Sequence, residues 1–199
     1  MSRYFIGLDL GQKRDYTALA ILDRSEGCYE VRHLERIQLC TSYSAITDRV
    51  HQLAYMTMRD GPTTLVVDAT GVGLPVFDEL SSWGLHPVGI TITGGRAVSR
   101  AHGLIRVPKS HLIKNMVALF QSQRLRIGTG LSGSAELVAE LLGFQVRINA
   151  RSRRESYQAG KRDLHDDLLL AVGMACFYGE NEDEYTGTDR SESPQREVI

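Results

Sequence analysis

Three short apolar segments at the start of the chain constrain its fold most. Residues 4–10, 16–23 and 28–39 are rich in Tyr, Ile, Leu and Val, and the segments GQKRD and RSEG separate them. Separators of this composition suit tight turns, so the pattern predicts a meander of three antiparallel strands. The first third of the chain is therefore expected to form antiparallel sheet.

The rest of the chain alternates between helix-like and strand-like segments. Residues 42–60 repeat apolar side chains at helical spacing, and a Gly-Pro pair follows them. A strand after such a helix is expected to lie parallel to the strand before it. Strands are expected at 63–69 and 85–92, helices at 70–84, 109–123, 132–143 and 166–179, and an edge strand at 144–150. The predicted fold class is α/β, a mixed sheet of a three-strand antiparallel meander plus parallel strands, flanked by helices.

Composition excludes several classes of protein. The three cysteines are odd in number and widely spaced, which argues against a disulfide framework or a thiolate zinc site and for a reducing cytoplasm. No segment approaches the roughly 20 apolar residues that cross a bilayer, and no export signal is evident. The sequence predicts a protein that is neither exported nor membrane-spanning.

Charge divides the chain into a body and a tail. Seven acids and two bases occur from Glu180 onward, and the formal net charge of the whole chain is -1, so residues 1–179 carry +4. The tail is polar and almost free of aliphatic side chains, so burial cannot offset the entropy lost on ordering. We expect one domain over residues 1–180 and a disordered acidic tail over 181–199.

Four aspartates lie in or beside apolar segments, where the burial of a charged side chain is unfavourable. Asp9 and Asp68 are each flanked by apolar residues of a predicted strand, and Asp166 and Asp167 open the last predicted helix. Any one of them alone is typically a cap or turn residue. Neighbouring parallel strands end at the same edge of a sheet, however, so Asp9 and Asp68 are expected side by side, with a third acid from the helix.

Such a group of acids predicts a metal site. Clustered carboxylates repel one another unless a cation binds among them, and hard oxygen ligands favour Mg²⁺ or Mn²⁺ over zinc. Two ions about 4 Å apart can activate a water and stabilise the leaving oxygen of a phosphodiester. The chemistry expected here is phosphodiester hydrolysis.

The order of these acids and elements resembles the ribonuclease H-like nuclease fold. Four segments further resemble the nuclease domain of tailed-phage terminase large subunits: GLDLGQKRDYTALAIL, VVDATGVGLPVFDEL, LIRVPKSHLIKNMVALFQSQRLRI and HDDLLLAVGMA. The likeness covers about residues 4–178 in order, and D-A-T-G-x-G is its most specific part. It implies an endodeoxyribonuclease that uses Mg²⁺ or Mn²⁺, with two ions, to cut double-stranded DNA during viral genome packaging in the host cytoplasm.

The resemblance assigns the catalytic and metal-binding residues one by one. Asp9 matches the ligand of the first strand and Asp68 the acid that ends the fourth; the third ligand is Asp166 or Asp167, a choice that stays open. Where such domains often carry a further acid, this chain has Leu170. No P-loop is present, so an ATPase motor domain or subunit is expected to be supplied elsewhere, with the portal and small terminase subunit as further partners.

Basic residues suggest where DNA binds. Residues 147–162, which run from within the predicted edge strand toward the last helix, have little to pack and are predicted to form a mobile loop that holds DNA phosphates. Its basic residues are Arg147, Arg151, Arg153, Arg154, Lys161 and Arg162. An earlier basic group, which includes Lys109, is equally well explained as solvated surface. His165 could assist proton transfer beside the metal ions, or it could be a cap or packing residue.

Other functions remain open. The segment GLDLGQKR also resembles the opening strand of RuvC-like Holliday-junction resolvases and related nucleases, which should be two-fold dimers that prefer four-way junctions. A non-catalytic docking module of a packaging motor would keep the acids without using them. A sugar-kinase/actin-like ATPase would need a duplicated domain, for which 199 residues leave no room.

Overall fold

The meander predicted at the start of the chain is present. The computed structural model describes residues 2–11, 15–71, 73–128, 130–149, 154–159 and 165–186. In it, β1 (Arg3–Asp9), β2 (Thr17–Ser25) and β3 (Cys28–Ile37) pair antiparallel. Glu26 and Gly27 form the two-residue turn between β2 and β3, with φ angles of 52° and 75°. Turns with two positive φ angles match the twist of the strands they join.

Strand β4 (Thr63–Asp68) extends the meander in the parallel direction, as predicted. It lies beside β1 after a crossover through α1 (Tyr43–Asp60). The side chain of Ser42 caps this helix by accepting a hydrogen bond from the Ala45 backbone N (3.2 Å). The apolar side chains that α1 buries are Ile46, Val50, Leu53 and Ala54.

Four more strands complete an eight-stranded sheet of order β6-β7-β5-β4-β1-β2-β3-β8. Strands β5 and β7 continue the parallel part, β8 lies parallel to β3, and β6 is antiparallel to β7. The sequence pattern predicted β5 but not the other three, two of which are only three residues long. Their bounds are β5 Val88–Thr93, β6 Ser99–Ala101, β7 Leu104–Pro108 and β8 Leu125–Ile127.

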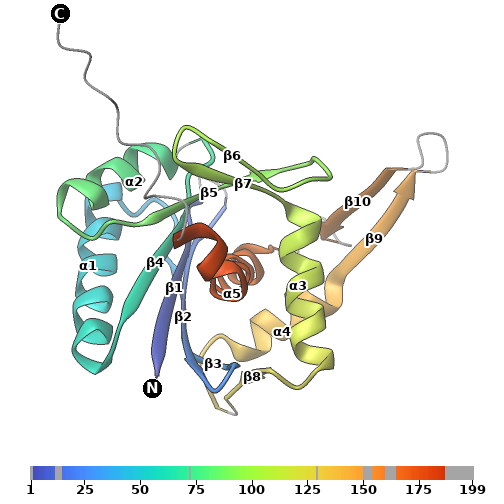
Figure 1. Cartoon of the computed structure of the whole chain (residues 1–199), viewed down its shortest axis with the longest axis horizontal. Helices are drawn as coiled ribbons and strands as arrows, with labels where there is room; N and C mark the ends of the chain where they lie inside the picture. Colours follow the sequence, from blue (N-terminus) through green and yellow to red (C-terminus); the bar gives the residue numbers. More distant parts are fainter. Residues whose placement is uncertain are drawn as a thin grey trace, which may run out of the picture.

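Helices cover both faces of the sheet, and each face has its own apolar core (Figure 1). Helix α1 and α2 (Gly73–Ser82) cover one face. On the other lie α3 (Lys109–Gln121), α4 (Ser134–Gly143) and α5 (Asp167–Thr186). The mixed sheet flanked by helices confirms the predicted fold class.

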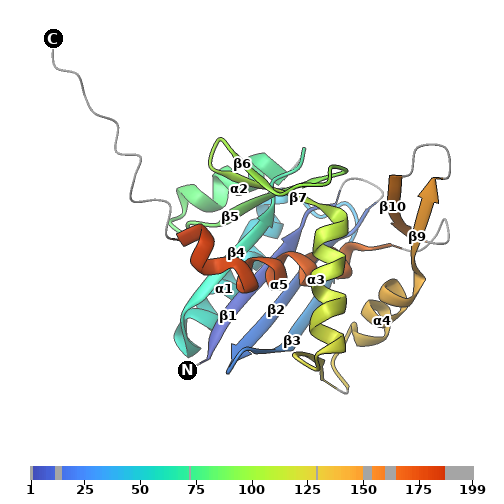
Figure 2. The ribbon, with the colours of Figure 1, turned by 45° about the vertical axis from the view of Figure 1, so that its right-hand side comes forward.

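Helix α5 is the central element of the second face. It crosses β1 and β2 directly, as Figure 2 shows, and every residue from Asp167 to Gly179 is buried. The approach is close because Gly7 has no side chain: a Cβ there would lie 1.9 Å from the carbonyl oxygen of Ala171. This glycine therefore sets how closely α5 can lie on the sheet.

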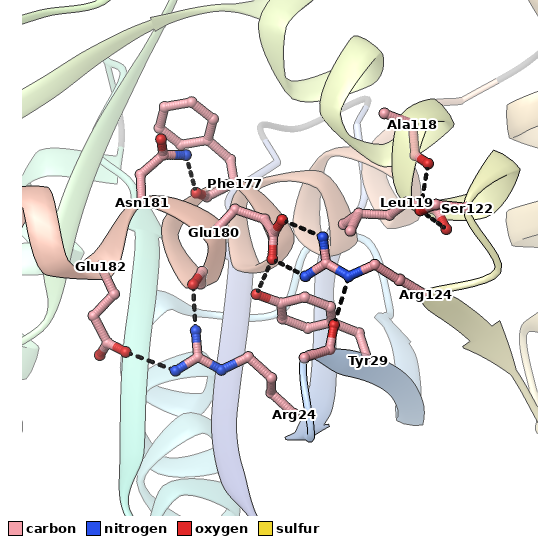
Figure 3. Close-up of polar contacts among 12 residues, drawn as sticks. Arg24, Tyr29, Ala118, Leu119, Ser122, Arg124, Phe177, Glu180, Asn181 and Glu182 are labelled. Carbon is pink, nitrogen blue, oxygen red and sulfur yellow. Dashed lines mark hydrogen bonds and ion pairs between the residues drawn. The ribbon is translucent and has the colours of Figure 1, made fainter.

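A polar network fixes the far end of α5 (Figure 3). Glu180 accepts hydrogen bonds from both terminal nitrogens of Arg124 (2.8 and 2.7 Å) and from the hydroxyl of Tyr29 (3.0 Å). Arg24 donates to Glu182 (3.1 Å) and to the carbonyl of Gly179. The network ties α5 to β2, to β3 and to the turn before β8.

We expect Glu180→Ala to lower the free energy of unfolding by about 1–2 kcal/mol, because it removes a bidentate ion pair and leaves the hydroxyl of buried Tyr29 without this acceptor. Asp183→Ala, on the exposed side of the same helix, is the matched control and should change stability little. Urea unfolding of the two variants measures the difference. Equal midpoints would show that the network does not stabilise the fold.

Two predicted segments differ from the structure. Helix α5 continues to Thr186, so residues 181–186 are not a disordered tail; Glu182 and Tyr185 are buried, and Glu182 also pairs with Arg3. The polar composition concealed the burial of Glu182 because its partners, Arg3 and Arg24, lie far away in the sequence. The rest of the predicted tail, 187–199, lies outside the described residues.

The segment 144–150 is not an edge strand of the main sheet. Strand β9 (Phe144–Asn149) instead pairs with β10 (Arg154–Ala159) in a separate two-stranded sheet, which projects beside α3 and α4 (Figures 1 and 2). The segment predicted as a basic loop is therefore in part a β-hairpin. Within the described residues, no helix is long and apolar enough to span a membrane.

Candidate active site

Two of the predicted acids meet at the carboxyl edge of the parallel strands. Asp9 is the last residue of β1 and Asp68 the last of β4, and Leu8 pairs with Val67 in the register just before them. Their exposed fractions are 8% and 9%, and the charge of Asp68 acts on the carboxyl group of Asp9. The prediction that Asp9 and Asp68 stand side by side is confirmed.

The start of α5 brings the other two acids to the same place. The carbonyl of Asp166 accepts from the Leu170 N (2.9 Å), which makes Asp166 the residue that precedes the helix, and Asp167 is its first residue. Asp167 is buried, whereas the side chain of Asp166 is 22% exposed. Both carboxylates act electrostatically on Asp9. The four acids therefore form one cluster, assembled from β1, β4 and α5.

Burial and mutual repulsion make this cluster costly to ionise. Burial, followed by the charges of Asp68, Asp167 and Asp166, raises the pKa of Asp9 well above its ordinary value. Burial likewise raises the pKa of Asp68, and it raises the pKa of Asp167 to about 6 against the opposing effect of Arg36. A bound cation would offset both costs, because it favours the ionised carboxylates.

The backbone around Asp68 holds its side chain in place. The Thr70 N donates to Asp68 Oδ1 (2.8 Å), and the chain then turns sharply into α2. A Cβ at Gly73 would lie 1.8 Å from the carbonyl oxygen of Asp68, so only glycine fits there. Of the two glycines of TGVG, Gly73 therefore serves close packing at the strand-to-helix turn, and Gly71 adopts a positive φ angle of 57°.

Two basic side chains that the sequence did not assign to the site also contact the acids. The Nζ of Lys109 lies 2.5 Å from Asp166 Oδ2. The Nε of Arg36, on β3, lies 3.4 Å from Asp167 Oδ2, and its guanidinium pairs with Glu140 of α4. Neither residue is near an acid of the cluster in sequence, so only the fold could reveal these pairs.

Glu140 was also missed, because it lies in a helix whose pattern predicts only core packing. Its side chain is buried, and its Oε2 accepts from the Leu169 N (2.7 Å) in the first turn of α5. Burial raises the pKa of Glu140 to about 7, although the Leu169 N–H and Arg36 both favour its ionised form. Glu140 thus fixes the helix start that carries Asp166 and Asp167.

The donors present fit a hard divalent cation. All four are carboxylates, and Asp167 Oδ2 is buried with no hydrogen-bond partner, although the Arg36 Nε lies 3.4 Å away as an ion pair. Among the described residues, however, no group of three or more His, Cys, Asp or Glu side chains is arranged so that it could hold a metal ion as it stands.

The structure describes only some of the other predicted site residues. His165 packs edge-on against the ring of Tyr16 (5.1 Å between centroids), which favours the packing interpretation. Of the predicted DNA-binding residues, Arg147 lies on β9 and Arg154 on β10. Arg151, Arg153, Lys161 and Arg162 lie outside the described residues.

Comparison with known proteins identifies the fold. No family model and no curated protein matches the chain. The large terminase nuclease of the thermophilic phage G20c with bound magnesium matches with 22% identity and a TM-score of 0.64, over 88% of this chain and 81% of that chain. The large terminase nuclease domain of bacteriophage SPP1 with bound Mn matches with 11% identity and a TM-score of 0.56, over 90% and 86%.

A longer protein also matches. It is the large terminase of another thermophilic bacteriophage, in complex with ATP-gamma-S, and it is 11% identical with a TM-score of 0.64, over 86% of this chain but only 38% of that chain. Together these matches confirm the ribonuclease H-like fold found in large terminase nuclease domains.

Proposed function

We propose that this chain is the nuclease domain of a terminase large subunit, an endonuclease that uses Mg²⁺ or Mn²⁺ to cut double-stranded DNA during viral genome packaging. The cluster of Asp9, Asp68, Asp166 and Asp167 carries this proposal, because no apolar core needs four acids at one sheet edge. The magnesium and manganese named for two proteins of the same fold support the choice of metal.

Asp9, Asp68 and one or both of Asp166 and Asp167 would hold two metal ions. Bound there, the ions supply an activated water and stabilise the leaving oxygen of the scissile phosphodiester. The protein fixes the geometry in advance: the Thr70 N–H orients Asp68, and Glu140 fixes the first turn of α5. Arg36 holds Asp167 against β3. Carboxylates restrained in this way lose little entropy when a cation binds.

The β9–β10 hairpin is the proposed DNA contact. It carries Arg147 and Arg154, joins α4 to the segment before α5, and projects from the body of the domain (Figure 2). Arginines on a projecting hairpin can follow phosphates without reading bases, which suits cleavage with little sequence preference. Arg151, Arg153, Lys161 and Arg162 belong to the same proposal.

The partners follow from the same proposal. The longer large terminase, of which this chain matches 38%, is described in complex with ATP-gamma-S, which supports an ATPase motor domain or subunit as a partner. Double-stranded DNA is the substrate, and the portal and small terminase subunit are further expected partners. The proposed place of action is the cytoplasm of the host bacterium.

Cleavage of supercoiled plasmid tests the proposed function. With Mg²⁺ or Mn²⁺ we expect nicked and linear products, and with EDTA we expect none, because the acids alone cannot activate water. A well-folded chain that cuts nothing with either metal would contradict the proposal and favour a docking module. Cutting of four-way junctions in strong preference to linear duplex would instead favour a resolvase.

A further inference from the structure

Lys109 lies at the same sheet edge as the catalytic acids. Strands β1, β4, β5 and β7 are all parallel, so their carboxyl ends share one edge. Asp9 ends β1, Asp68 ends β4, and Lys109 follows Pro108, the last residue of β7. The topology thus brings one lysine to the edge that carries two buried carboxylates.

The side chain of Lys109 belongs to the acid cluster rather than to the solvated surface. Its Nζ lies 2.5 Å from Asp166 Oδ2, and the two side chains are only 27% and 22% exposed. Its charge also acts on Asp9 and Asp68, lowering the pKa of each against the larger effect of burial. One ammonium group therefore contacts one of the four proposed metal ligands and acts electrostatically on two more.

From this geometry we propose that Lys109 is the resident counter-cation of the site, and that a divalent metal ion must displace its ammonium from Asp166 in order to bind. The inference rests on the proposed function, since it assumes that Asp166 is near the metal. Lys109 and the metal compete for one carboxylate group. Without metal, Lys109 limits repulsion among the acids; with metal, its positive charge opposes the incoming cation.

Two opposite effects of Lys109→Gln test the competition. In EDTA at pH 8, the variant should melt about 2–6 °C lower than the wild type, because the acids lose their compensating charge. Its affinity for Mn²⁺, measured by calorimetry without DNA, should rise roughly tenfold. Lys109→Arg keeps the charge and should restore both values toward those of the wild type. Arg59→Gln, which removes an exposed positive charge on α1, should change neither.

The wild-type protein offers a second measurement that needs no folded variant. Acetylation by an amine-reactive ester, read by mass spectrometry, should label Lys109 faster with saturating Mn²⁺ than with EDTA, because the metal frees its amine. Labelling of Lys114, which is exposed on the same helix, serves as the internal reference.

The outcomes separate this inference from the proposed function. Unchanged or weaker Mn²⁺ binding by Lys109→Gln, or labelling of Lys109 that does not respond to Mn²⁺, would overturn the inference. Either result could occur in a protein that still cuts plasmid with metal. If wild-type protein binds no Mn²⁺ and cuts nothing, the proposed function fails first, and the inference fails with it.

Discussion

Replacing Asp68 by Asn should lower the rate of plasmid cleavage by about 10³-fold or more, and Asp9→Asn should do the same. Each substitution removes one anionic ligand while keeping nearly the same shape, so metal binding and the alignment of the reacting water are lost together. Folding should not suffer, because a neutral amide replaces a carboxylate that is at most 9% exposed and repelled by its neighbours. The measurement is cleavage at saturating Mn²⁺, together with the melting temperature.

Asp78→Asn is the matched control for these variants. It makes the same chemical change on the exposed surface of α2, across the sheet from α5, and should leave cleavage and melting unchanged. A variant of Asp9 or Asp68 that cuts at near wild-type rate while folded would remove that residue from the catalytic site. Loss of folding together with activity would point to a structural role.

Gly7→Ala should destabilise the domain by about 3 kcal/mol or more. The added Cβ would lie 1.9 Å from the carbonyl oxygen of Ala171, and backbone atoms cannot rotate away as a side chain can. Helix α5 would have to lift from β1. The expected fall in melting temperature is roughly 6–12 °C, measured by calorimetry.

Gly94→Ala provides the comparison. A Cβ at Gly94 meets no atom within 4 Å, so the same substitution should cost little. If Gly7→Ala melts within about 2 °C of this control, α5 can relax away from the sheet at small cost, and the close approach does not limit stability.

Much of the fold could be predicted because local patterns dictate it. Apolar segments between turn residues predicted the β1–β3 meander, and the helical spacing of Ile46, Val50 and Leu53 predicted α1. Short strands were missed for a physical reason: β6 and β8 have three residues each, too few for a period to emerge, and long-range pairing determines them. The end of α5 was missed because ion pairs with distant arginines, such as Arg24, bury Glu182.

The acids of the candidate site could be predicted because Asp9 and Asp68 interrupt apolar strands, where a charge is conspicuous. Their partners could not. Lys109 and Arg36 are ordinary basic residues in the sequence, and Glu140 lies in an ordinary amphipathic helix. Which acid meets which base depends on sheet order, and sheet order is a property of the whole chain.

Two proposed metal ligands, Asp166 and Asp167, lie at the start of helix α5, and the turns that follow them are buried. Because its residues are buried to Gly179 and its far end is tied to Arg24 and Arg124, this helix can detach only when much of the domain opens. Hydrogen exchange of its amides would then report global rather than local unfolding. The four acids should therefore stay together for as long as the domain is folded, whether or not a metal ion or DNA is bound.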